Sequence, residues 1–300
     1  MTNPKINTIK RGGSRYYVEP SSGRKNPGVT SVVNMLPKEF LKFWAAKMVA
    51  EFAVEHLGEV VGIAMTNPEA AVDMLKGTPT RFTKGAADVG SDAHDAFEKI
   101  AKGENVRVTP PLKPYIEHFN EFLELAQPEF IFTEETVWND ELGYAGSFDA
   151  LATIRGDIPG MKGKTLFFDW KTTRSGVHEE VALQLSAYRK ATHIIRPDGS
   201  RVPLPKTDGA AVLLIRPEGW KLVPVETDVV TLVEPVLDPD DPERVIVPGV
   251  SVNVIDYFIA LREVLDWESD VKKRVIGKPV AAGGEFATEK AVINKPREVK

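Results

Sequence analysis

The chain has 300 residues, a formal net charge of −5, 42% hydrophobic residues and 27% charged residues, which is typical of a soluble globular protein. The lack of Cys excludes disulfides, thiolate metal sites, an iron–sulfur cluster held by cysteines and a cysteine nucleophile. No secretion signal is visible in the first residues, and no apolar run reaches the roughly 18 residues that a membrane span needs. We therefore expect a cytoplasmic protein with no membrane contact.

The first 126 residues are predicted to be mainly helical. Residues 1–29 are polar and predict an arm or a short hairpin, whereas residues 30–56 carry apolar side chains at helical spacing. Pro68 follows a cap-like Thr66-Asn67 pair, which indicates the start of another helix. Two further helices are expected over residues 86–101 and 114–125.

Beyond residue 126 the pattern changes to strands. The predicted strands cover residues 129–138, 143–155, 164–172, 209–216 and 220–227. Helices are predicted over residues 178–195 and 251–275, with a Pro- and Asp-rich loop over residues 238–249. This order predicts an α/β (α+β) core decorated by helices.

One segment imitates a phosphate-binding loop. In "GDIPGMKGKT" the pattern G-x-x-x-x-G-K-[ST] would need Gly where Ile158 stands, and the segment lies between two strands. We therefore expect no bound nucleotide and no motor activity.

Three polar residues lie on two neighbouring predicted strands. Asp149 follows two glycines in "GYAGSFDAL", and Asp169 and Lys171 share one face at the end of "FFDWK". If the two strands form a hairpin, the two carboxylates come together and repel one another unless a cation lies between them. Mg²⁺ suits such a pair, and an adjacent lysine can stabilise charge on a phosphate. For the D-x-K pattern alone, the alternative is an ion pair at a strand end.

Further polar residues flank this pair. Gln184 and Tyr188 lie at i, i+4 on one face of the next predicted helix, and His94 lies four residues after Gly90 near the start of an earlier one. Either feature alone is compatible with an ordinary amphipathic helix.

Together, four motifs occur in order: Gly90 to His94 (G-x-x-x-H), Gly146 to Asp149 (G-x-x-D), Asp169 to Lys171 (D-x-K) and Gln184 to Tyr188 (Q-x-x-x-Y). This set resembles the RecB-like branch of the PD-(D/E)XK nuclease superfamily, and looks most like the stand-alone exonucleases of bacteriophage recombination and replication. The resemblance covers approximately residues 80–225.

The resemblance implies a restriction-endonuclease-like mixed central sheet flanked by helices, with an added N-terminal helical region. It divides the chain into an N-terminal arm and helical region packing on the core (1–80), a nuclease core with a C-terminal helix (81–270) and a basic tail (271–300). The connection between Asp149 and Asp169 is longer than is usual in the family.

The resemblance also implies roles for individual residues. The expected metal ligands are His94, Asp149, Asp169 and the carbonyl of Trp170, and Lys171 is the expected catalytic lysine. The expected substrate contacts are Gln184, Tyr188 and Arg174, and Glu135 is a possible outer-shell carboxylate. Apart from the resemblance, the positions of Lys38, Lys42, Lys47, Arg81, Lys84, Arg174, Arg189 and Lys190 predict a DNA groove, and for each one alone the alternative is a solvated surface.

The implied function is a metal-dependent DNA exonuclease that hydrolyses phosphodiester bonds of linear DNA, in phage recombination, replication or repair. The implied cofactor is Mg²⁺ or Mn²⁺, and the implied partners are double- or single-stranded DNA ends and a recombinase or single-strand binding protein, in the host cytoplasm if the chain is phage-encoded. Two alternatives remain open: a DNA-end or protein binding module with little turnover, and a structure-selective endonuclease.

Overall fold

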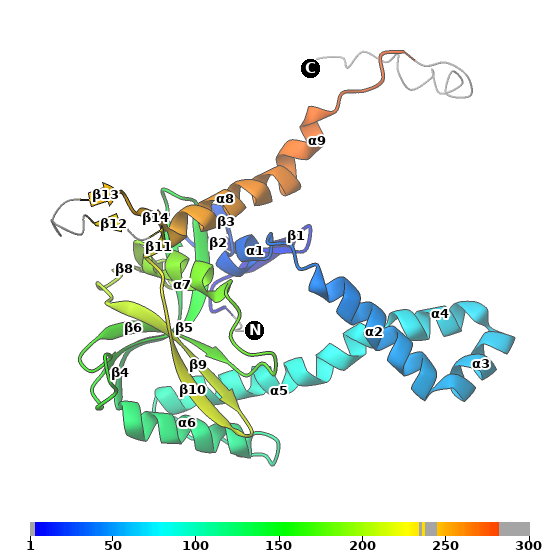
Figure 1. The fold of residues 1–300 in the computed structure, drawn as a ribbon, viewed down its shortest axis with the longest axis horizontal. Coiled ribbons are helices and arrows are strands. Elements are labelled where there is room, and N and C mark those ends of the chain that lie inside the picture. The colour runs from blue at the N-terminus through cyan, green and yellow to red at the C-terminus, as the bar shows by residue number, and fades with distance from the viewer. Residues whose placement is uncertain (1–3, 234–235, 238–244, 282–300) are drawn as a thin grey trace.

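A computed structural model describes residues 4–233, 236–237 and 245–281. Its centre is a seven-stranded mixed sheet flanked by helices, which confirms the predicted fold class (Figure 1). In spatial order the strands are β10 (Gly219–Val225), β9 (Gly209–Arg216), β6 (Thr165–Lys171), β5 (Tyr144–Ile154), β4 (Pro128–Asn139), β7 (His193–Ile195) and β8 (Arg201–Pro203).

The predicted hairpin forms the middle of this sheet. β5 and β6 are antiparallel neighbours, and β6 then pairs in parallel with β9. Strand alternation sends side chains to both faces: Leu151 and Phe167 point to one, Ala150 and Phe168 to the other. Both faces are therefore covered.

Helices cover the two faces differently. On the face of Ala150 and Phe168 lie α5 (Thr78–Ala101) and α6 (Lys113–Ala126). On the face of Leu151 and Phe167 lie α1 (Val29–Val33), α7 (Val181–Arg189) and α8 (Val254–Asp266). Two apolar cores thus enclose the sheet.

The N-terminal residues form a small sheet instead of a plain arm. It consists of β1 (Thr8–Arg11), β2 (Ser14–Val18) and β3 (Lys25–Pro27), and it connects to β5 through a bridge between Gly28 and Ala145. The prediction of a single helix over residues 30–56 is wrong, because the chain turns around Pro37 between α1 and α2. Val29 and Val32 are buried beneath the sheet as a result.

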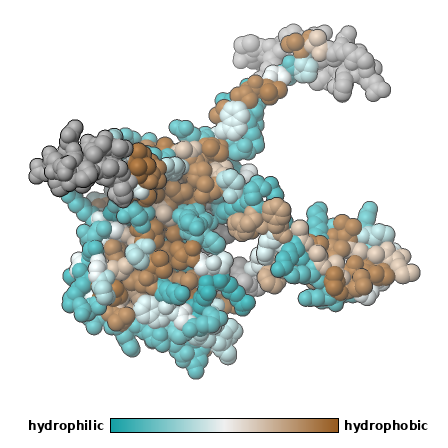
Figure 2. Space-filling model, viewed as in Figure 1, coloured by the Kyte–Doolittle hydropathy of each residue, from teal (hydrophilic) through white to brown (hydrophobic). Residues whose placement is uncertain are grey.

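Three helices project from the core as an arm: α2 (Phe40–Glu55), α3 (Leu57–Thr66) and α4 (Pro68–Lys76). The predicted helix start at Pro68 is confirmed, since the Asn67 side chain accepts a hydrogen bond from the Ala70 amide at 3.1 Å. Among residues of these helices whose side chains the structure describes, only Ala71 is buried. Figure 2 shows hydrophobic surface along this arm.

The C-terminal part also departs from the sequence prediction in places. The helix expected over residues 178–195 ends at Arg189, and its last residues form β7. The long C-terminal helix is α8, continued by a π-helical turn (Trp267–Val271) and α9 (Lys272–Val275). Small ladders join β11 (Val229–Val233) to β14 (Val250–Asn253) and β12 (Val236–Leu237) to β13 (Val245–Val247).

Much of the predicted basic tail, residues 282–300, lies outside the described residues, as does most of the predicted loop over 238–249. Within the described part of the chain, every helix is too short or too polar to cross a membrane.

Candidate active site

The two aspartates lie where β5 and β6 separate. The ladder between these strands ends at the pair Ala150–Phe168, so Asp149 and Asp169 occupy the next opposed positions, beyond the last paired residues. Asp149 Oδ2 accepts a hydrogen bond from the Trp170 amide at 2.6 Å, which fixes the carboxylate at this fork. Both aspartates are buried.

Glu134 on β4 supplies a third carboxylate. With Asp149 and Asp169 it forms a row across three neighbouring strands, which we call the carboxylate row. On β4, Thr133 pairs with Ala150 and Glu135 pairs with Phe148, so Glu134 lies opposite Asp149. Its φ of 51° is in the left-handed region, which costs an L residue about 1–2 kcal/mol. The neighbouring strands β4, β5 and β6 therefore each contribute one acidic side chain to the same place in the sheet.

His94 reaches the row from α5. Single ligand atoms of His94, Glu134 and Asp149 lie within 4.8 Å of one another. His94 Nδ1 is 3.7 Å from Asp149 Oδ1, too long for a hydrogen bond, and it is buried without a partner. Burial, followed by the nearby Lys171 ammonium, lowers the pKa of His94 to about 4, so the ring is neutral and able to ligate a metal.

Lys171 and Gln184 hold Asp169 from two sides. Lys171 Nζ donates to Asp169 Oδ1 at 2.9 Å, and Gln184 Nε2 donates to the same oxygen at 2.8 Å. The other carboxylate oxygen, Asp169 Oδ2, lies 2.7 Å from Lys171 Nζ but outside hydrogen-bond geometry. It accepts no hydrogen bond and so keeps a lone pair available. Gln184 therefore positions a carboxylate, whereas the sequence predicted it as a substrate contact.

Among the described residues, Asp169 pairs with the Lys171 ammonium, whereas Glu134 and Asp149 have no Lys or Arg ion-pair partner. Burial and then Asp149 raise the pKa of Glu134 to about 9. Burial raises the pKa of Asp149 to about 6, against the lowering effect of Lys171, and burial likewise raises the pKa of Asp169. Oxygen donors crowded in this way, with a neutral imidazole beside them, fit a divalent cation.

Two close approaches explain the glycines of the motifs. A Cβ on Gly146 would lie 2.7 Å from Tyr188 Cε1 and 2.8 Å from a Val29 methyl carbon. A Cβ on Gly90 would lie 2.8 Å from Thr172 Oγ1, directly after β6. The glycines let α7 and α5 pack against the strands that carry the aspartates.

The Trp170 indole anchors the helix that carries His94. Its ring packs edge-on against Phe97, at 5.9 Å between centroids, and against Phe119, at 5.4 Å. Because Phe97 lies one turn beyond His94 on α5, this contact fixes the helix relative to β6.

Of the other predicted site residues, Tyr188 and Glu135 are placed differently from expectation. Tyr188 is buried and its hydroxyl donates to the Ser147 carbonyl at 2.7 Å, so it positions β5 and does not face a substrate. Glu135 lies 3.7 Å from the Arg196 guanidinium, and the adjacent Glu134 takes the place expected of it. Arg174 is exposed on the loop after β6.

Two of the expected groove cations also have other partners. Arg189 donates to the Thr207 hydroxyl at 3.1 Å and pairs with Asp228, and Lys190 lies 3.1 Å from Asp228. These contacts connect α7 to the segment before β11 and leave Arg189 largely buried. The Lys84 side chain lies outside the described part of the chain.

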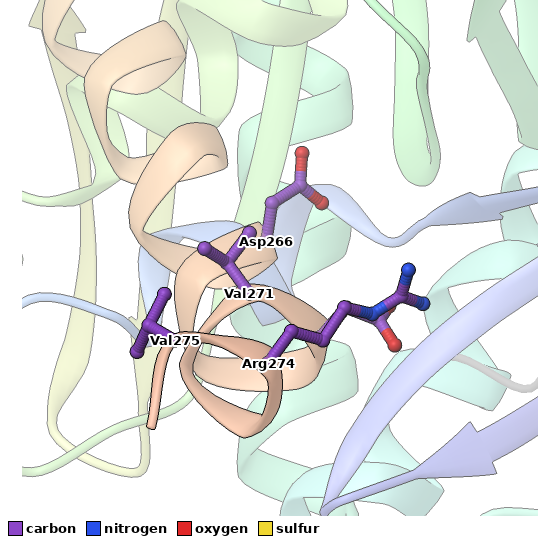
Figure 3. A pocket seen from close by; sticks show the side chains of 5 residues that line it. Asp266, Val271, Arg274 and Val275 are labelled. Carbon is purple, nitrogen blue, oxygen red and sulfur yellow. The ribbon is translucent and has the colours of Figure 1, made fainter. Parts of the chain in front are cut away.

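Among known protein families and curated proteins, none matches this sequence. A surface hollow of about 400 Å³ lies on the C-terminal helix and is lined by Asp266, Asp270, Val271, Arg274 and Val275 (Figure 3). None of the residues in the carboxylate row lines it. The chemistry of the carboxylate row therefore carries the functional argument.

The raised pKa of Glu134 predicts a pH-dependent stability of the metal-free protein. In the folded state Glu134 keeps its proton up to a pKa of about 9, whereas in the unfolded chain it loses the proton above its ordinary pKa of 4.5. The contribution of this proton to the free energy of unfolding is therefore complete below pH 4.5 and is lost as the pH rises toward about 9. In EDTA we expect the melting temperature to fall by at least about 3 °C over this window, and Mg²⁺ to restore it most at high pH.

Differential scanning fluorimetry across this pH range checks the prediction, with Glu134→Gln as the comparison. The variant has no proton to lose at this position, so its curve in EDTA should be flatter than that of the wild type. Parallel curves for the two proteins would contradict the prediction.

Proposed function

We propose that this protein is a metal-dependent nuclease that hydrolyses phosphodiester bonds of DNA and acts as an exonuclease on linear DNA. The observation that carries the proposal is the row Glu134–Asp149–Asp169 across three adjacent strands, with the Lys171 ammonium against Asp169. A strand-end ion pair would need only Asp169 and Lys171. It would not explain two further buried acids and an unpartnered imidazole beside them.

The residues that would hold the metal are His94, Glu134, Asp149 and Asp169. Carboxylate oxygens favour Mg²⁺, and the imidazole nitrogen makes Mn²⁺ an acceptable replacement. A bound ion would supply Lewis-acid activation of water and neutralise charge on the phosphate.

The protein's own groups supply positioning and a positive charge. The Trp170 amide fixes Asp149, and Gln184 fixes Asp169, so the carboxylates are held before substrate arrives. Burial lowers the pKa of Lys171, but Asp169 and Asp149 raise it by more, so the amine remains an ammonium. Lys171 can therefore donate a hydrogen bond to a phosphate oxygen and stabilise the charge that develops there.

Resemblance to stand-alone phage exonucleases supports the finer parts of the proposal. It favours action at DNA ends, in the cytoplasm of a host cell, beside a recombinase or single-strand binding protein that uses the exposed strand.

The test is incubation of the purified protein with linear and covalently closed circular DNA, in Mg²⁺, Mn²⁺ or EDTA. We expect loss of linear DNA only, with either metal and not with EDTA. Cutting of the closed circle would make the protein an endonuclease. DNA binding without cleavage of either substrate, in either metal, would overturn the proposal in favour of a binding module.

A further inference from the structure

Three phenylalanines are exposed where the arm meets the core. Phe40 and Phe43 begin α2 and are 61% and 76% exposed, and Phe82 near the start of α5 is 64% exposed. The Phe82 ring lies 6.3 Å from that of Trp44, which continues the aromatic surface along α2. We call Phe40, Phe43 and Phe82 the aromatic platform. Figure 2 shows hydrophobic surface in this region and on the arm.

Lysines lie close to the platform in the sequence. Lys38, Lys42 and Lys47 are each within four residues of Phe40 or Phe43. Arg81 is adjacent to Phe82, but its guanidinium donates to the Met74 carbonyl at 2.6 Å and lies over the Phe52 ring. Lys42 and Lys47 pair with glutamates of their own helix, at 2.7 Å and 3.4 Å, but such exposed pairs are weak and phosphates can replace the partner. The outer half of the arm is different, since it carries the acids Glu55, Glu59, Glu69 and Asp73.

Helix α5 connects the platform to the candidate active site. Phe82 and His94 belong to one helix, α5, and are about 18 Å apart along its axis. This is the length of about five stacked nucleotides of one strand. On the other side, Lys38 Nζ lies 3.7 Å from the Glu180 carboxylate, at the start of the helix that carries Gln184.

We propose that the aromatic platform binds single-stranded DNA by stacking bases on Phe40, Phe43 and Phe82, and directs that strand along α5 to the catalytic centre. The proposal rests on the proposed function, because it names the form of DNA that the same site receives. Base faces are accessible only in unpaired nucleotides, and exposed aromatic rings near lysines match a stacked base and its phosphate together. A purely apolar partner would not account for the cations.

The test compares binding of a single-stranded oligonucleotide of about 12 nucleotides, by fluorescence anisotropy in EDTA, with binding of its duplex. The double variant Phe40→Leu/Phe43→Leu keeps an apolar surface but removes the aromatic faces. We expect it to bind the single strand about 5- to 30-fold more weakly, and Phe40→Trp/Phe43→Trp to bind at least as well as wild type.

The control changes equally exposed apolar residues on the acidic half of the arm. Val54→Ala/Met65→Ala, at residues that are 77% and 83% exposed, should leave single-strand binding unchanged. Unchanged binding by the leucine variant would overturn the proposal. A leucine variant that binds DNA normally but loses self-association in light scattering would also overturn it, and would assign the surface to a second copy of the chain.

Failure of this inference can be distinguished from failure of the proposed function. Hydrolysis of bis(p-nitrophenyl) phosphate by the wild-type protein with Mn²⁺ reports on the catalytic centre without any base to stack. Hydrolysis together with normal DNA binding by the leucine variant rejects the platform alone. Platform-dependent binding without hydrolysis of this ester or of DNA rejects the nuclease alone.

Discussion

Replacing Lys171 by methionine is expected to lower kcat for DNA hydrolysis by about 10²- to 10³-fold. Methionine keeps the length and apolar part of the side chain but removes the ammonium that lies against Asp169. The lost group is a charged donor in a buried site, where such interactions are strongest. Single-turnover cleavage of linear DNA at saturating metal measures the effect.

Lys164→Met is the matched control, since Lys164 is an exposed lysine directly before the same strand. It should keep wild-type cleavage. Because removal of Lys171 leaves Asp169 without its cation, the melting temperature and the Mn²⁺ affinity of the variant should be measured as well. A folded, metal-binding Lys171→Met protein with normal cleavage would contradict the role given to this lysine.

Replacing Glu134 by glutamine is expected to weaken Mn²⁺ binding by about 10- to 100-fold and to lower cleavage at limiting metal. The glutamine is similar in shape but cannot supply a negative oxygen to the ion that His94 and Asp149 would share. Isothermal titration with Mn²⁺ measures the affinity, and cleavage should recover partly as the metal concentration is raised.

Glu135→Gln supplies a comparison one residue away. Glu135 faces Arg196, so its replacement should change Mn²⁺ affinity by less than about twofold, as for a weak, partly exposed ion pair. Equal losses in the two variants would show that charge near β4, and not a ligand at Glu134, supports metal binding. A loss confined to Glu135→Gln would contradict the site as described.

The sequence alone determined the part of the site that depends on local geometry. Residues two apart on a strand share a face, so Asp169 and Lys171 had to be neighbours. The glycine-rich loop between the two strands predicted a hairpin that brings Asp149 beside Asp169, and the antiparallel pairing of β5 with β6 agrees. Apolar runs and the break after residue 126 likewise predicted a mixed sheet flanked by helices.

The tertiary structure alone decided which side chains of other elements complete the site. Phe130 and Phe132 are two apart but pack in opposite cores, because β4 has an irregularity between them, and Glu134 adds a left-handed residue. These departures from alternation bring Glu134 to the site instead of Glu135, which the resemblance had implied as the acid of this strand.

The sequence also did not determine which side chains of each helix are buried. Helical spacing put Gln184 and Tyr188 on one face of α7, but packing against Gly146 buries the tyrosine while the glutamine reaches Asp169. Conversely, Phe40 and Phe43 had the spacing of a core helix, and the structure leaves them exposed. Local pattern fixes which residues share a face, whereas contacts between elements far apart in the chain fix what that face meets.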